Sequence, residues 1–183
     1  MSESTAPAAL SEAQRAVHDA IVGGPRGSAS PFPITNPDGS LVGPFGLMVR
    51  FPALGDPLQA LGAALRYRTR MSARIREIVI LTVARMADSA FERYAHTAVA
   101  QSLGISDHEI TALLTGRFAS DDPQESGAAR FAEALMENSH APSQDFGLDG
   151  ELIAEVVTTV GYYRLLAQLM GQFEVAAPGE IDA

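Results

Sequence analysis

The chain has 183 residues, of which 46% are hydrophobic and 19% charged, a balance that predicts one globular domain and argues against wholesale disorder. Its formal net charge of -9 excludes the basic surface that binds nucleic-acid phosphates, and its apolar runs are too short to span a bilayer. It contains no cysteine, which excludes disulfides, thiolate metal centres and thiol nucleophiles.

The N-terminal residues lack a basic segment followed by an apolar stretch, so we predict no signal peptide and expect a cytoplasmic protein. The first predicted helix covers 11–22, with Ser11 as its N-cap. The segment 23–52 is rich in Gly, Pro, Ser and Asn, and no helix is predicted in it. Its apolar residues are expected to lie on the rest of the protein; they are Phe32, Phe45, Leu47, Met48 and Phe51.

Helical patterns dominate the chain from Pro52 onward. One helix is predicted over 56–68, and the next begins at Ser72. That second helix is apolar nearly all round, as expected of a helix buried in the domain. The helix that starts with SAFERYAH ends before Gly104, because glycine readily adopts the left-handed conformation that stops a helix.

Three further helices complete the predicted domain. Ser106 and Glu109 have the spacing of a capping box, and Gly116 is the expected terminator of their helix. An amphipathic helix over 123–138 and a long apolar helix over 149–174 follow. The sequence therefore predicts an all-α protein of about six to eight helices.

The stretch SAFERYAH (89–96) places Glu92 and His96 four residues apart, on one face of a helix. The pair could be a solvated ion pair, a structural histidine with its partner, or an acid–base site. A metal site is disfavoured, because di-iron bundles use Glu-x-x-His and no second histidine lies nearby, so no metal is predicted. Glu77 lies near the start of the preceding helix among apolar residues.

The run RYRTRMSARIREIVILTVARMADSAFERYAHTAVAQSLGISDHEITALLTG (66–116) resembles the carboxymuconolactone decarboxylase family, which shares its fold with the alkylhydroperoxidase D (AhpD-like) proteins. In that family a helix opening with Arg-Glu-(Leu/Ile) precedes the helix that bears the active-site motif. A segment Gly-(Leu/Ile)-(Ser/Thr)-x-x-Glu-(Ile/Val) follows, and residues 104–110 match it. GPFGLMVRFPALGDPLQALG (43–62) resembles the family's lead-in, and VTTVGYYRLLAQLMGQFEV (157–175) resembles its closing helix.

The resemblance predicts three parts of the chain. Residues 42–175 are expected to form an AhpD-like helical domain. An N-terminal helix and an extended Gly/Pro-rich arm, 1–41, would precede it, and a flexible tail, 176–183, would follow. The family's usual assembly implies a homotrimer or a multiple of three.

The peroxidase branch of these proteins uses Glu, eleven residues, and then Cys-x-x-Cys-x-x-x-His. In this register Glu77 aligns with the glutamate, Ser89 with the first cysteine, Glu92 with the second and His96 with the histidine. A serine and a glutamate cannot form the disulfide of a thiol peroxidase, so that activity is excluded. The decarboxylase branch lacks the thiol pair and keeps Glu-x-x-x-His, which SAFERYAH resembles.

The resemblance implies acid–base catalysis without a cofactor, by a lyase or isomerase acting on a small carboxylated or lactone-like metabolite. His96 would exchange a proton near neutral pH, and Glu92 would hold the charged ring. Glu77 would orient His96 or act as a second acid or base. The candidate substrate-binding residues are Arg50, Arg76, Arg93, Phe45 and Ser89.

Two alternatives stay open at this point. The protein could catalyse another proton transfer, such as a dehydration, cyclisation or hydrolysis, or it could be a non-catalytic ligand-binding or structural oligomer. Tyr162 and Tyr163 are expected in the core, with a pocket position for one of them as the alternative. Phe45 and its neighbours Gly43 and Pro44 could form a lid over the pocket or an arm that clamps a neighbouring subunit.

Overall fold

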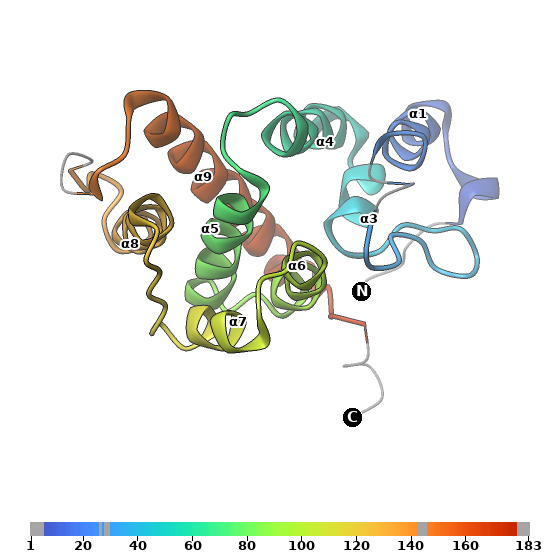
Figure 1. Cartoon of the computed structure of the whole chain (residues 1–183). Helices are drawn as coiled ribbons and strands as arrows, with labels where there is room; N and C mark the ends of the chain where they lie inside the picture. The colour runs from blue at the N-terminus through green and yellow to red at the C-terminus, as the bar shows by residue number, and fades with distance from the viewer. Residues whose placement is uncertain (1–5, 26, 28–29, 143–145, 179–183) are drawn as a thin grey trace.

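The computed structural model describes residues 6–25, 27, 30–142 and 146–178. These residues form eight α-helices, one short 3-10 helix and a single β-bridge between Thr35 and Leu41, with no strand longer than that bridge. The helices are η1 (Pro7–Ala9), α1 (Glu12–Val22), α3 (Gly43–Arg50), α4 (Pro52–Tyr67), α5 (Ala73–Met86), α6 (Ala90–Ser102), α7 (Asp107–Leu114), α8 (Pro123–Glu137) and α9 (Gly150–Gln172). The prediction of an all-α fold is confirmed (Figure 1).

Helix α5 is the centre of the protein, enclosed by α6, α7, α8 and α9 (Figure 1). It begins after Ser72, whose hydroxyl accepts a hydrogen bond from the backbone N–H of Ile75 at 3.1 Å. Every residue from Ile75 to Ala84 is buried, as the all-round apolar pattern predicts. A polar side chain in this stretch is therefore held away from bulk water on all sides.

The predicted helix ends follow from local hydrogen bonds. Ser11 caps α1 and Ser106 caps α7, each in a capping box with the residue three positions later. Gly104 and Gly116 follow α6 and α7 with φ of +79° and +70°, a conformation that glycine adopts without steric cost. The short-range signals for these helices are thus confirmed.

Helix α3 corrects one prediction, because it lies in the Gly/Pro-rich segment where no helix was expected. Pro44 stands in its first turn, where the missing N–H would have had no partner, so the proline favours the helix instead of breaking it. Gly43 starts the helix at φ +58°, and a Cβ there would lie 2.1 Å from the ring of Phe91. The close contact requires glycine at this position.

The N-terminal residues pack on the same core as the rest of the chain. Val17 and Ile21 of α1 are buried, and α1 contacts α3 and α4. Of the apolar residues predicted to lie on the protein, Leu47 and Met48 are buried and Phe32 and Phe45 are partly buried against the core, whereas Phe51 is 39% exposed. The predicted flexible tail, 176–183, lies largely outside the described residues, although Ala177 is buried.

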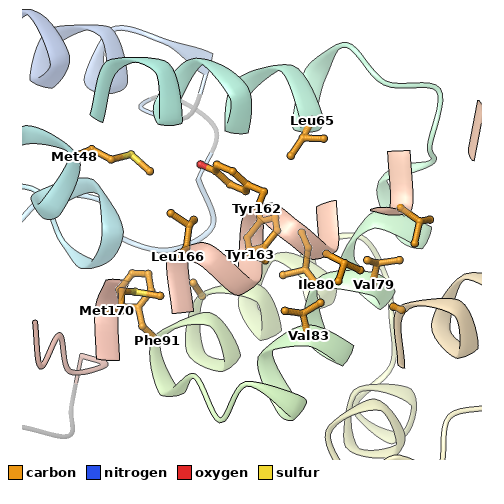
Figure 2. Close-up of a cluster of buried hydrophobic side chains, with 14 of the residues drawn as sticks. Met48, Leu65, Val79, Ile80, Val83, Phe91, Tyr162, Tyr163, Leu166 and Met170 are labelled. Atoms are coloured by element: carbon orange, nitrogen blue, oxygen red, sulfur yellow. The ribbon is translucent and has the colours of Figure 1, made fainter. Parts of the chain in front are cut away.

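Helix α9 fills the space between the N-terminal helices and the α5–α6 pair. Figure 2 shows its side chains Tyr162, Tyr163, Leu166 and Met170 among residues from α3, α4, α5 and α6. The Tyr162 hydroxyl donates a hydrogen bond to the backbone carbonyl of Leu58 on α4 at 3.1 Å, which satisfies a polar group in this apolar layer. None of the described helices is long and apolar enough to cross a bilayer.

Two glycines in helices should respond to alanine in opposite ways. A Cβ at Gly55 would lie 1.9 Å from the backbone carbonyl oxygen of Met48, so Gly55→Ala must push α4 away from α3 and should lower the free energy of unfolding by about 3 kcal/mol. Gly161 of α9 has no atom within 4 Å of such a Cβ, so Gly161→Ala should raise it by about 0.5–1 kcal/mol. Urea denaturation measures both; equal shifts would contradict the close α3–α4 contact.

Candidate active site

Three titratable side chains meet where α5 and α6 pack together. Glu77 lies on α5, and Glu92 and His96 lie one turn apart on the inner face of α6. The Nδ1 atom of His96 is 2.5 Å from Oε2 of Glu77, and its Nε2 atom is 3.3 Å from Oε2 of Glu92. Glu77 is 0% exposed, Glu92 2% and His96 5%, so the imidazole lies between two buried carboxylates.

Two arginines surround the carboxylate of Glu77 from the side away from His96. Arg66, from the last turn of α4, places Nη2 at 3.3 Å from Oε1 of Glu77. Arg76 places Nε at 3.5 Å from the same oxygen and donates from Nη1 to the Arg66 carbonyl at 3.0 Å. Both oxygens of Glu77 therefore have cationic partners, which a buried carboxylate requires.

This arrangement sets the charge of the site near neutral pH. Burial by itself lowers the pKa of His96, but the carboxylates of Glu77 and Glu92 outweigh it and raise that pKa above the ordinary 6.5. Burial by itself raises the pKa of Glu77, but His96, Arg66 and Arg76 outweigh it and hold that pKa below the ordinary 4.5. Both shifts favour an imidazolium at His96 paired with an ionised Glu77.

A pocket of about 450 Å³ opens beside this cluster. His96 and Glu92 line it from α6, Arg66 and Arg76 from α4 and α5, and Tyr163 from α9. The segment 30–34 and the start of α3 complete its wall. Its other lining residues are Ser30, Pro31, Phe32, Ile34, Pro44, Phe45, Tyr67, Thr69, Met71, Ala73, Phe91, Ala95, Val99, Ser102, Leu103, Tyr162 and Leu166.

Two buried polar atoms of the pocket-lining residues have no hydrogen-bond partner among the described residues. They are Oε1 of Glu92, an acceptor, and Nε of Arg76, a donor. Buried polar atoms are normally satisfied, so an unsatisfied acceptor and donor at one pocket indicate groups that a ligand or water would complete. No group of three or more His, Cys, Asp and Glu in the described part of the chain could hold a metal ion.

The structure brings together most of the residues singled out in the sequence, but not all of them. Glu92, His96, Arg76 and Phe45 line the pocket, and Glu77 lies directly behind His96. The other three candidates do not line it: they are Arg50, Arg93 and Ser89.

Each of these three has another place in the fold. The guanidinium of Arg50 lies 5.3 Å from the ring centres of both Phe51 and Phe173. Arg93 is one residue beyond Glu92, which is a rotation of about 100° around the helix, so the two side chains lie on different faces. Arg93 pairs with Asp88 at 2.8 Å. Ser89 is buried at the N-cap position of α6.

Arg66 is a pocket residue that sequence reasoning did not assign, whereas Tyr162 and Tyr163, for one of which a pocket position was the alternative, both line the pocket. Arg66 belongs to the run RYRTR, and nothing in its local sequence distinguishes it from Arg68 and Arg70. The ring of Tyr163 meets the His96 ring edge-on, with centroids 5.0 Å apart. Burial raises the pKa of Tyr163 to about 12, so its hydroxyl stays neutral at physiological pH.

Comparison with known proteins supports the resemblance. Residues 52–134 match the model of the carboxymuconolactone decarboxylase family. No curated protein matches the chain.

Solved structures share the fold at low sequence identity. A peroxidase-related protein with an alkylhydroperoxidase AhpD core, from Ralstonia eutropha JMP134, superposes with a TM-score of 0.77 and 14% identity; the match covers 98% of this chain and 92% of that one. A protein of unknown function from Agrobacterium tumefaciens gives a TM-score of 0.65 with 16% identity, covering 73% of this chain and 97% of that one.

A peroxidase-related protein from Silicibacter sp. TM1040 also gives a TM-score of 0.65, with 14% identity over 74% of this chain and 77% of that one. These likenesses establish the AhpD-like fold. Glu77, Glu92 and His96 all lie inside the matched residues 52–134, and the chain has no cysteine. Residues 52–134 are thus similar to the carboxymuconolactone decarboxylase family, and the chain, which has no cysteine, has the AhpD-like fold.

Proposed function

We propose that the protein is a cofactor-independent acid–base enzyme, a lyase or isomerase that acts on a small carboxylated or lactone-like metabolite as carboxymuconolactone decarboxylase does. The observation that carries the proposal is the position of His96, held between two buried carboxylates at a pocket that also contains two arginines. A positioned acid–base group of this kind contributes about 10²–10⁴-fold to a proton-transfer rate.

The three titratable residues have different roles in this proposal. His96 is the proton donor, because the carboxylates of Glu77 and Glu92 raise its pKa and favour its protonated form. Glu92 is a catalytic residue that faces the pocket, since its Oε1 is unpaired and can accept a proton from the substrate. Glu77 does not line the pocket and acts as a positioning residue, which fixes the His96 ring through Nδ1 and stabilises its charge.

A decarboxylation at this site needs no reactant other than the substrate and water. The arginines bind the substrate carboxylate and the conjugated oxygen that becomes negative. The carbon–carbon bond to the carboxylate breaks, its electron pair stays on the substrate as an enolate, and CO₂ leaves. The proton of the His96 imidazolium is transferred to the carbanionic carbon, and the neutral imidazole then takes a proton that Glu92, 3.3 Å from its Nε2, relays from water.

Replacing the carboxylate of Glu92 by an amide should lower catalysis without changing the fold. Glu92→Gln keeps the side-chain shape but cannot exchange a proton, so we expect turnover to fall by about 10²-fold with the fold unchanged. The measurement is a panel of lactone acids and β-keto acids without added metal or cofactor, following CO₂ release and, by NMR, exchange of substrate protons with D₂O. Glu137→Gln, an exposed carboxylate at the end of α8, is the matched control.

The panel also separates the alternative functions. Exchange of substrate protons without CO₂ release would replace decarboxylation by isomerisation or another proton transfer. A panel that binds but neither exchanges nor releases CO₂ in the wild type would contradict the enzymatic proposal and favour a ligand-binding oligomer. Equal turnover in Glu92→Gln and wild type would remove Glu92 from the chemistry.

We also propose that the chain assembles as a homotrimer or a multiple of three, as the family resemblance implies. Large apolar side chains are exposed on α4 and α9, which contact each other: Leu54 is 66% exposed, Val157 42%, Leu61 40% and Leu165 40%. Exposed apolar groups on neighbouring elements are typical of subunit interfaces. Light scattering should give a multiple of three times the 19.3 kDa chain mass, and Leu54→Glu with Leu61→Glu should dissociate it; a monomeric wild type would contradict the proposal.

A further inference from the structure

The pocket beside His96 is enriched in aromatic rings. The chain has eight Phe and four Tyr and no Trp, and half of these twelve residues line this one pocket: Phe32, Phe45, Tyr67, Phe91, Tyr162 and Tyr163. Aliphatic side chains could enclose a ligand of any shape, whereas aromatic rings favour a partner that is itself flat and aromatic. The lining therefore indicates something about the ligand beyond its polarity.

Several of these rings meet at nearly right angles. Tyr162 and Tyr163 have an interplanar angle of 87°, Tyr163 and His96 90°, and Phe32 and Phe91 80°. Perpendicular rings form walls of two orientations, so one flat ligand can place its face against one ring and its edge against another. Both contacts are preferred aromatic geometries, with centroids about 4.5–7 Å apart.

The charges at the pocket leave room for one negative charge. Arg66, Arg76 and protonated His96 are three cations, and they face two carboxylates, Glu92 in the wall and Glu77 behind it. One positive charge is thus uncompensated among these groups. Arg66 and Arg76 both line the pocket, so their guanidinium groups are the cations with which a ligand carboxylate can pair.

We propose that the substrate is a planar monoanion of two or three fused rings, at least one of them aromatic, whose carboxylate is conjugated through the ring system to a carbonyl oxygen. The pocket of about 450 Å³ lies within the roughly 300–1,000 Å³ typical of sites for drug-sized ligands, which is more than a single five-membered lactone acid needs. The carboxylate lies at Arg66 and Arg76, and the rings lie against the aromatic walls. This substrate class presupposes the proposed function, because it assigns the pocket to the substrate.

Three probes of similar size separate charge from aromaticity. Naphthalene-2-carboxylate has both features, naphthalene-2-methanol removes the charge, and decahydronaphthalene-2-carboxylate keeps the charge but loses the flat π-system. Isothermal titration calorimetry on the full chain should show binding of the first, with a Kd at least about tenfold lower than for either of the others. Equal affinity for the saturated acid would overturn the aromatic assignment, and equal affinity for the alcohol would overturn the anionic one.

Two variants test whether naphthalene-2-carboxylate binds in this pocket. Phe32→Leu removes one ring of the wall from a segment outside the central helices and should raise the Kd of naphthalene-2-carboxylate by about threefold to tenfold. Phe51→Leu is the control, since Phe51 is 39% exposed and stacks on Phe173 instead of lining the pocket. If neither variant, or only Phe51→Leu, changes the Kd, the proposed location is wrong.

A third variant separates this inference from the proposed function. Glu92→Gln should lose turnover on the lactone-acid and β-keto-acid panel and still bind naphthalene-2-carboxylate, because it leaves Arg66, Arg76 and His96 in place. Turnover in the wild type together with no preference for the aromatic acid would leave the acid–base function standing and overturn the substrate class. Preferential binding of the aromatic acid with no turnover of any acid, including fused-ring β-keto acids, would support the aromatic ligand class and overturn the acid–base function.

Discussion

His96→Gln is expected to lower turnover by about 10²–10⁴-fold, the contribution of a positioned general acid–base group. The amide nitrogen and oxygen of glutamine can replace some hydrogen bonds of the ring, but neither can deliver a proton at neutral pH. The ring lies 2.5 Å from Glu77 and 3.3 Å from Glu92 through its two nitrogens. Its loss therefore removes the proton donor and the link between the two carboxylates at once.

The pH dependence of turnover tests whether His96 is the proton donor. Because the pKa of His96 is raised above 6.5, the wild type should keep its activity through neutral pH and lose it as the pH rises through that raised pKa. The residual activity of His96→Gln should lack this alkaline limb. His108→Gln, on the exposed surface of α7, is the matched control and should behave as wild type. An unchanged alkaline limb in His96→Gln would show that another group supplies the proton.

Glu77→Ala is expected to lower the free energy of unfolding by about 3–5 kcal/mol, the loss typical when one partner of a buried ion pair is removed. Glu77 is 0% exposed and its carboxylate is the common partner of Arg66, Arg76 and His96. Without it, these cations would stay inside the fold with one carboxylate, Glu92, beside His96. Urea denaturation measures the loss, and Glu137→Ala on the exposed end of α8 should change stability by no more than about 0.5 kcal/mol.

The ion pair between Glu77 and His96 predicts a range of pH in which the fold is most stable. The pKa of Glu77 is lowered from 4.5 in the folded protein, so its contribution is present above pH 4.5 and is lost as the pH falls through the lowered value. The pKa of His96 is raised from 6.5, so its contribution is present below pH 6.5 and is lost as the pH rises through the raised value. The pair should stabilise the fold most between pH 4.5 and 6.5, and Glu77→Gln should flatten both slopes.

Much of the fold follows from short-range sequence signals. Ser11, Ser72 and Ser106 begin their helices where the sequence predicts, because an N-cap hydroxyl satisfies a backbone N–H that the helix leaves unpaired. Helix α3 could not be read in the same way. Its glycines and proline have low helix propensity, and the helix is stabilised by burial of Leu47 and Met48 against distant parts of the chain.

The central residues of the site could be predicted where they are close in sequence or lie in the family register. The i, i+4 spacing places Glu92 and His96 on one face of a helix, and the family register adds Glu77. Arg66 depends on the packing of α4 against α5, so its neighbours Arg68 and Arg70 are equally good candidates in the sequence. Arg50 was a candidate for the pocket but does not line it, because the direction of α3, a helix that was not predicted, decides where its side chain points.

The pocket is lined both by residues inside the family-matched range 52–134 and by residues outside it. The proton-transfer residues Glu77, Glu92 and His96 lie inside the family-matched residues 52–134, whereas Phe32, Phe45 and the two adjacent tyrosines of α9 lie outside them. Under the proposed function, part of the ring wall is thus encoded apart from the proton-transfer residues, although Arg66, Arg76, Tyr67 and Phe91 lie within the matched residues. If the proposed function holds, exchanging residues 30–45 for those of a relative should change the ligand preference and leave Glu77, Glu92 and His96 in place.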